Sequence, residues 1–424
     1  MWESLATTQR QDRVLHGGAK LLNLLVGLVA LPLWLLAQRL REPLVRLLGR
    51  FDSKPVGLPL PAPRARDMDA LMADLEGIPC RLRPNPRAEL RKGFADLSSF
   101  VLAQNRETAN FGYAYPRQFS DHVFDGADGV PIGASVALHD SPRPGLIVVH
   151  GVFTTRRFDY VRQIAVRAYY EWGFNVAAVD LRSFGLTELL TAAPSTGGWK
   201  EGEDLIAVAC GLKGLGATTV GALGISLGGS SVLGACHPEG AEEAIDGGIL
   251  AVSPPADIGK ASERLSRQVA VRNPQYLLNR LFRAMLLSRT RGSRWSPEIA
   301  GLDDALDLLP TAYYEISGEE VRQRSSAVNH IAKARVPVLI LHPEDDHIIK
   351  VEHARMLSAA AADNHRVRVW ILPGGGHGAI DAVDRDWAYA VYRGFFERWA
   401  TYPDRDGGEL VYSAAPTGNV SASG

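Results

Sequence analysis

Short apolar runs alternate with helical patterns from about residue 119 to residue 400. The first two runs flank a glycine-containing turn at 126–129, which predicts a β-hairpin. The later runs are continuously apolar, as expected of strands buried on both faces. They cover 145–151, 174–180, 219–226, 247–254, 336–343 and 366–374, and helical patterns cover 159–172, 201–215, 227–236, 351–362 and 384–400. This alternation predicts an α/β fold, with a mostly parallel sheet covered by helices on both faces.

One interval between two predicted strands is too long for a simple crossover. About 80 residues separate Pro254 from Val336, whereas a parallel crossover needs only about a dozen. We interpret about 256–325 as a helical cap over the C-terminal edge of the sheet. The predicted organisation is an N-terminal hydrophobic and amphipathic helical segment (1–51), a proline-rich linker (52–66), a helical extension packed on the core (67–118), the α/β domain with its cap (119–400) and a polar tail (401–424).

The N-terminal segment contains 17 uncharged residues at 21–37, followed by arginines that alternate with leucines up to residue 51. This length is just short of the ~20 apolar residues that span a bilayer. Three interpretations compete: a membrane anchor that spans the bilayer or lies on it through 21–51, a buried or homo-oligomer-forming helix, and a cleaved signal peptide. A slight excess of basic residues after the segment places the bulk of the chain on the cytoplasmic side.

Charge and cysteine content narrow the function classes. The formal net charge is −1, so no overall field attracts nucleic acid, and we expect no nucleic-acid partner. The three cysteines, Cys80, Cys210 and Cys236, have no paired spacing typical of a zinc site or a disulfide framework. We therefore expect free thiols, no bound metal and no cofactor.

The pattern G-x-S-x-G occurs at 224–228, with Ser226 at its centre. An apolar run precedes it and a helical pattern follows, which is the context that a nucleophilic serine on a sharp strand-to-helix turn requires. Small residues are needed on either side because the backbone segments approach closely there. We predict that Ser226 is a nucleophile and that the amide of Leu227 is one donor of an oxyanion hole.

Candidates for an acid and a base follow the last two apolar runs. Glu344, Asp345 and Asp346 come after the first of these, and His377 comes after the second, among glycines. Since a serine hydroxyl needs a base to remove its proton, we predict His377 as the base. Asp346 is the predicted acid that orients it, with Asp345 and Glu344 as the alternatives.

Other polar residues near the predicted strand ends are interpreted as supporting the site and not as acids, bases or nucleophiles. His342 and His347 flank the acidic loop and are expected to pack or form local hydrogen bonds. The loop at 150–153 follows a strand, and we predict that the Val152 amide is the second oxyanion donor while His150 shapes the loop. Arg182, in the turn at 180–185, is expected to be structural.

These motifs together resemble the α/β-hydrolase superfamily and, more narrowly, its YheT-like branch of predicted esterases, with some phospholipase-type members. The resemblance covers about 120–400 and rests on VVHG (148–151), DLRSFG (180–185), GISLGG (224–229), AVSPPADI (251–258), HPEDDHII (342–349) and GGGHG (374–378). It implies an α/β-hydrolase fold and a Ser-Asp-His triad formed by Ser226, Asp346 and His377. Members of the branch often carry a hydrophobic N-terminal helix.

We therefore expect a serine esterase or lipase that acts on a small-molecule ester or lipid substrate without a cofactor. Cleavage of a thioester, cleavage of an amide and acyl transfer would use the same residues, because a fold and a triad do not determine the leaving group. The alternative from another class is a non-catalytic binding protein of the same fold at a membrane.

Overall fold

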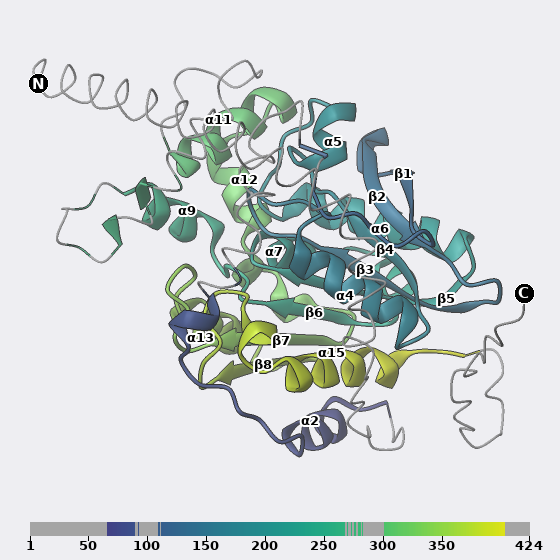
Figure 1. The fold of residues 1–424 in the computed structure, drawn as a ribbon. Coiled ribbons are helices and arrows are strands. Elements are labelled where there is room, and N and C mark those ends of the chain that lie inside the picture. Colours follow the sequence, from purple (N-terminus) through teal and green to yellow (C-terminus); the bar gives the residue numbers. More distant parts are fainter. Residues whose placement is uncertain are drawn as a thin grey trace, which may run out of the picture.

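Eight strands form one twisted sheet in the order β1-β2-β4-β3-β5-β6-β7-β8 (Figure 1). The pairs β1–β2 and β2–β4 are antiparallel, and all other neighbours are parallel. The predicted hairpin and the mostly parallel sheet are thus confirmed. The strands are β1 (Ser120–Asp125), β2 (Pro131–Ala137), β3 (Arg143–Val149), β4 (Asn175–Val179), β5 (Ala217–Ile225), β6 (Ile249–Val252), β7 (Val338–Pro343) and β8 (Val367–Leu372).

This computed structural model describes residues 66–89, 92, 109–110, 112–267, 269, 273, 275–276, 279–280, 282 and 301–402. The predicted membrane or oligomer segment at 1–51, the linker up to residue 65 and the tail from residue 403 lie outside the described residues. Within the described ranges, every helix is too short or too polar to cross a bilayer.

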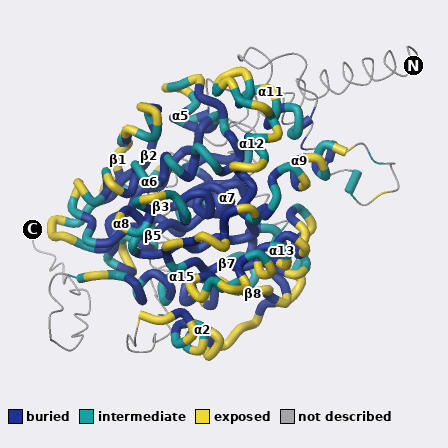
Figure 2. Tube along the Cα trace, turned by 180° about the vertical axis from the view of Figure 1, so that it is seen from behind, coloured by how far each residue is buried: buried dark blue, intermediate teal, exposed yellow. Residues whose placement is uncertain are grey.

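Both faces of the sheet are buried, because side chains of the central strands alternate between two apolar clusters. In β3, Ile147 and Val149 join one cluster, whereas Leu146 and Val148 join the other. The first cluster is closed by α6 (Trp199–Gly214), α7 (Leu227–Gly234) and α13 (Glu352–Ala360), and the second by α4 (Asp159–Tyr170), α15 (Arg385–Trp399) and α2 (Met68–Glu76). Figure 2 shows the central strands as continuously buried and the exposed residues on the outer helices and loops.

The five helices predicted in the α/β domain, which are α4, α6, α7, α13 and α15, begin and end close to the predicted positions. The described residues form helices α2 (Met68–Glu76), α4 (Asp159–Tyr170), α5 (Gly185–Leu190), α6 (Trp199–Gly214), α7 (Leu227–Gly234), α8 (Ala241–Ala244), α9 (Ile258–Ser266), α11 (Leu302–Tyr314), α12 (Gly318–Ser325), α13 (Glu352–Ala360), α14 (Ile380–Val383) and α15 (Arg385–Trp399). Between β6 and β7, α9, α11 and α12 fill the interval that we interpret as a cap, and they lie together at the upper left of the molecule in Figure 1.

The N-terminal extension is helical only in part. The Asp67 side chain accepts a hydrogen bond from the Ala70 amide and so caps α2, whose buried side chains pack in the same cluster as α15. The chain then runs without regular structure through 79–85 and is helical again at 86–89. The prediction of a helical extension over 67–118 was therefore wrong for 79–85, where Pro79 and Pro84 lack the amide hydrogen that a helix interior needs. It was also wrong for 112–118, where the chain has turns and no regular structure.

Candidate active site

Ser226 occupies a strained turn between β5 and α7. Its backbone has φ 58° and ψ −117°, a conformation that is costly for a non-glycine residue. The neighbouring chain leaves no room for side chains, since a Cβ at Gly224 would lie 2.0 Å from the Gly228 carbonyl oxygen, and a Cβ at Gly228 would lie 2.5 Å from the His150 carbonyl oxygen. The two glycines of the motif thus permit the turn that places Ser226 at the start of a helix.

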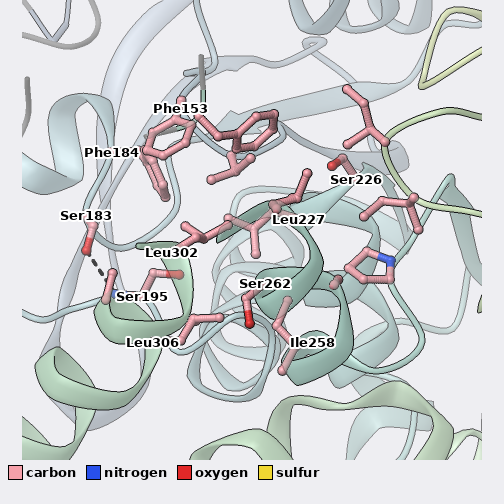
Figure 3. Close-up of a pocket in the computed structure, with 18 of the residues that line it drawn as sticks. Phe153, Ser183, Phe184, Ser195, Ser226, Leu227, Ile258, Ser262, Leu302 and Leu306 are labelled. Atoms are coloured by element: carbon pink, nitrogen blue, oxygen red, sulfur yellow. Dashed lines mark hydrogen bonds between the residues drawn. The ribbon is translucent and has the colours of Figure 1, made fainter. Parts of the chain in front are cut away.

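A cavity lies next to this turn (Figure 3). Figure 3 shows Ser226 and Leu227 on its wall together with Phe153, Phe184 and the cap residues Ile258, Leu302 and Leu306. The described lining residues include no charged side chain. The residues that line it are Val152, Phe153, Ser183, Phe184, Ser195, Ser226, Leu227, Pro255, Ile258, Ala261, Ser262, Leu265, Phe282, Leu302, Ala305, Leu306, Leu309, Ile348 and Ile349. Its lining suits an uncharged, largely apolar ligand.

The structure brings His377 and Asp346 together. The His377 Nδ1 atom lies 2.8 Å from Asp346 Oδ2, and the Asp346 Oδ1 atom accepts hydrogen bonds from the amides of Ile348 (2.9 Å) and Ile349 (2.8 Å). Burial by itself raises the pKa of the Asp346 carboxyl, but the His377 ring, the His342 ring and the hydrogen bond from the Ile349 amide outweigh it and hold that pKa below its ordinary value. Asp346 is therefore a buried carboxylate that can fix the orientation of the His377 ring.

Asp345, the alternative acid, contacts the same loop in a different way. Its Oδ1 atom accepts a hydrogen bond from the Gly376 amide at 2.9 Å and so holds backbone instead of the His377 ring. The Glu344 side chain is exposed and lies 3.8 Å from the Arg355 guanidinium. The geometry thus favours Asp346 among the three candidates.

The loop that carries His377 lies beside the Ser226 turn. A Cβ at Gly378 would lie 2.7 Å from the Ile225 side chain, and the Gly378 amide donates to the Ser253 hydroxyl at the end of β6 (3.4 Å). Within the described residues, Ser226 and His377 are not joined by a direct hydrogen bond, and the Ser226 hydroxyl borders the cavity with 8% of the residue exposed. The loop that carries the base candidate thus lies against the strand end that carries the nucleophile candidate, and hydrogen bonds between such groups commonly tighten only when substrate binds.

Two backbone amides near Ser226 can donate hydrogen bonds to an oxyanion. Leu227 is the first residue of α7, so its N–H has no carbonyl in a preceding helical turn to bind. Val152 lies in the turn after β3, lines the same cavity, and its N–H donates to no other described residue. The preceding amide, Gly151 N–H, donates to the Tyr160 hydroxyl at 2.8 Å and so anchors this turn to α4.

The sequence profile of the alpha/beta hydrolase family matches residues 146–388, which is more than half of the chain. The chain belongs to the alpha/beta hydrolase family. Its fold is similar to that of the Pyrococcus furiosus esterase Pf2001, with 18% identity, a TM-score of 0.49, and coverage of 68% of this chain and 99% of that one. It is also similar to a putative aryl esterase from Burkholderia cenocepacia, with 20% identity, a TM-score of 0.43, and coverage of 66% and 99%. No curated protein matches this chain in sequence.

Two charged or polar residues near the site of this alpha/beta hydrolase are held by buried partners. The His150 ring is buried, with Nδ1 2.7 Å from the Gly151 carbonyl and Nε2 accepting from the Leu181 amide at 3.0 Å, so it links two loops above the sheet. Arg182 forms a two-point ion pair with Asp204, with both distances at 2.7 Å. These contacts agree with the structural roles that the sequence predicted for His150 and Arg182.

His342 and His347 also have local contacts. His342 is buried and its Nε2 atom lies 2.8 Å from the Ile349 carbonyl, which supports the turn that contains Asp346. His347 is half-exposed, and its Nδ1 atom lies 3.5 Å from the Glu89 carboxylate. Glu89 itself accepts a hydrogen bond from the His377 amide at 2.8 Å. Sequence motifs did not single out this residue, because it is 288 positions away from His377 in the chain.

Cys236, His237 and His330 form a cluster with metal-ligating atoms, all within 4.8 Å of one another. The two imidazole rings are stacked, with centroids 4.1 Å apart and planes at 19°. A metal ion lies in the plane of each imidazole that binds it, so one ion cannot satisfy two stacked rings. The cluster also follows the C-terminal end of α7, about 12 Å along the helix from Ser226. We interpret it as packing and not as a metal centre.

The buried ring of His330 makes stability depend on pH. The pKa of His330 is lowered to about 3, mainly by burial, with smaller contributions in the same direction from the His237 ring and the Lys333 ammonium. Since an unfolded histidine titrates near ~6.5, the unfolded chain binds a proton that the folded chain rejects between about pH 6.5 and pH 3. This group therefore lowers the unfolding free energy as pH falls through that window, by up to ~1.4 kcal/mol per pH unit.

Replacing His330 with leucine is expected to make the acid side of the stability profile shallower. Neither ring nitrogen of His330 has a hydrogen-bond partner within the described residues, so leucine removes the titration without breaking a bond. Urea unfolding at several pH values between 3 and 7 measures the effect, with the exposed His365→Leu as the control. A slope equal to that of the wild-type chain would contradict this account.

Proposed function

We propose that this alpha/beta hydrolase is a carboxylic-ester hydrolase in which Ser226, His377 and Asp346 act as a triad. The single observation that carries the proposal is the position of Ser226 at the N-terminus of α7, on the wall of an uncharged cavity, next to the loop of a histidine held by a buried carboxylate. Each group has the type and the environment that acyl transfer to a serine needs.

The proposed reaction proceeds through an acyl-enzyme. His377 Nε2 removes the Ser226 proton as Oγ attacks the carbonyl carbon, and the amides of Val152 and Leu227 bind the resulting oxyanion. The tetrahedral intermediate collapses, and His377 gives the proton to the leaving alcohol. A water molecule then transfers a proton to His377 and attacks the acyl carbon, and Ser226 leaves with that proton restored. Asp346 stays ionised throughout and stabilises the protonated ring.

The cavity supports an apolar acyl chain as the preferred substrate. Its wall is formed mostly by aliphatic and phenyl side chains. Burying a hydrocarbon chain against such a wall is favourable by about 25 cal/mol for each Å² of apolar surface removed from water. Reaction with a fluorophosphonate probe and hydrolysis of p-nitrophenyl esters of increasing acyl length test the proposal. We expect the probe to label the protein, and kcat/KM to rise with the length of the acyl chain until the cavity is full.

A protein that neither reacts with the probe nor cleaves any ester, but binds fatty acids, would instead be a binding protein. Matched thioester and anilide substrates compare the other leaving groups.

A narrower proposal is that the chain belongs to the YheT-like branch. Support comes from the packing of two of its motifs, GISLGG and AVSPPADI, in adjacent strands. A Cβ at Gly229 would lie 3.0 Å from Pro254. The residue before this proline, Ser253, has a φ of 52°, and its hydroxyl accepts a hydrogen bond from the Gly378 amide. The second motif thus contacts both the nucleophile helix and the histidine loop.

We also propose that residues 21–51 hold the chain at a membrane, with the catalytic domain on the cytoplasmic side. The uncharged stretch at 21–37 and the apolar cavity together suit an enzyme that takes substrate from a lipid phase. Carbonate washing of a membrane fraction is expected to leave the full-length chain in the pellet and to release a variant that lacks residues 1–50. If both are released alike, the segment does not act as an anchor, and sedimentation analysis would then test whether it forms a homo-oligomer.

A further inference from the structure

The glycine-rich loop that carries His377 does not hold itself in place. Gly375, Gly376 and Gly378 all have positive φ values, and such a segment has many alternative backbone conformations. Instead, side chains from elsewhere bind successive backbone groups of the loop. Asp345 accepts from the Gly376 amide and Glu89 from the His377 amide, while the Lys92 ammonium donates to the Gly378 carbonyl at 2.6 Å.

Two of these three side chains come from the N-terminal extension, which precedes the sheet and lies outside the family match at 146–388. The extension and the loop fit closely against each other. A Cβ at Gly374 would lie 2.3 Å from the backbone of Arg83, and a Cβ at Gly376 would lie 1.7 Å from the Glu89 carboxylate. The backbone of the extension thus requires glycine at 374, whereas at 376 glycine is favoured by its positive φ and gives room for the Glu89 carboxylate.

Lys92 connects the same loop to the turn that carries the oxyanion amide of Val152. Its ammonium forms a 2.7 Å ion pair with Asp381, just beyond the histidine loop, and lies 5.1 Å from the centre of the Tyr160 ring. The Tyr160 hydroxyl in turn accepts a hydrogen bond from the Gly151 amide at 2.8 Å. Lys92 is mostly buried, with 18% of its side chain exposed, so its contacts are only weakly screened by water.

We propose that Glu89 and Lys92 are positioning residues of the active site, which fix the His377 loop relative to the oxyanion turn. The proposal rests on the function proposed above, because it assigns these residues to the correct placement of the base. Neither side chain lines the substrate cavity. Their loss therefore misplaces the base without weakening substrate binding, and a displacement of about 1 Å in such a group lowers the rate on the order of 10²-fold.

The test compares Glu89→Ala and Lys92→Met with their conservative counterparts, Glu89→Gln and Lys92→Arg. Glutamine keeps an oxygen that accepts from the His377 amide, and arginine keeps a cationic donor for the Gly378 carbonyl. We expect kcat on a p-nitrophenyl ester to fall on the order of 10–100-fold in the first pair, with KM within about twofold of wild type, and most of kcat to return in the second pair. Glu76→Ala, at an exposed position of the same extension, is the matched control.

Thermal unfolding of each variant separates positioning from a general loss of fold. Wild-type kcat in both Glu89→Ala and Lys92→Met would overturn the proposal, as would a rise in KM at unchanged kcat, or a loss of activity that matches the unfolded fraction. These outcomes differ from failure of the proposed function itself, in which the wild-type chain neither reacts with the fluorophosphonate probe nor hydrolyses any ester. If Glu89→Ala does not fold, the comparison of Lys92→Met with Lys92→Arg decides the matter.

Discussion

Replacing Ser226 with alanine is expected to lower kcat by about 10⁶-fold on any ester that the wild-type chain hydrolyses, and to abolish labelling by a fluorophosphonate. The reason is that no acyl-enzyme can form without the hydroxyl, so the His377–Asp346 pair has no nucleophile to activate. The strained backbone at Ser226, with φ 58°, suits alanine no less than serine, and the fold should persist. KM should change little, because one hydroxyl contributes a small part of the cavity surface.

The matched control is Ser230→Ala, one helical turn further along α7. The Ser230 hydroxyl is buried and donates to the Pro255 carbonyl at 3.3 Å, and Ser230 itself is not one of the residues that line the cavity. We expect this variant to keep its activity and its labelling. If labelling persisted in Ser226→Ala, another residue would be the nucleophile, and the role proposed for the Ser226 turn would be wrong.

Replacing Asp346 with asparagine is expected to lower kcat by about 10⁴-fold while KM stays near the wild-type value. The amides of Ile348 and Ile349 both donate to Oδ1, so the amide oxygen of asparagine must take that position. The amide nitrogen then faces His377 Nδ1, 2.8 Å away in the native chain, as a donor. This arrangement places the ring proton on Nε2, where it blocks removal of the Ser226 proton.

Asp345→Asn is the control for the neighbouring carboxylate. Its Oδ1 atom only accepts from the Gly376 amide, and asparagine can accept the same bond. We expect a loss of less than about tenfold, since the loop keeps its anchor. Steady-state kinetics of the two variants on one ester measure the difference. An equal loss in both would mean that the acid of the triad had been assigned incorrectly.

The sequence predicted most elements of the α/β domain because their signals are local. Strands buried on both faces read as continuous apolar runs, and the helices between them show helical periodicity. The motif at 224–228 predicted the turn at Ser226 for a steric reason that acts within five residues. The extension was predicted less well, since helical periodicity in α2 was extrapolated through the prolines at 79 and 84.

Tertiary structure alone decided how the later loops meet. The sequence left Asp345 and Asp346 as neighbouring alternatives, because adjacent residues in a turn point in different directions that only the fold determines. It also gave no sign of Glu89 and Lys92, since an amide or a carbonyl of the His377 loop can be bound by any suitable side chain nearby in space. Local steric rules thus determined the nucleophile turn and the order of elements, whereas contacts between segments almost 300 residues apart determined what holds the base in place.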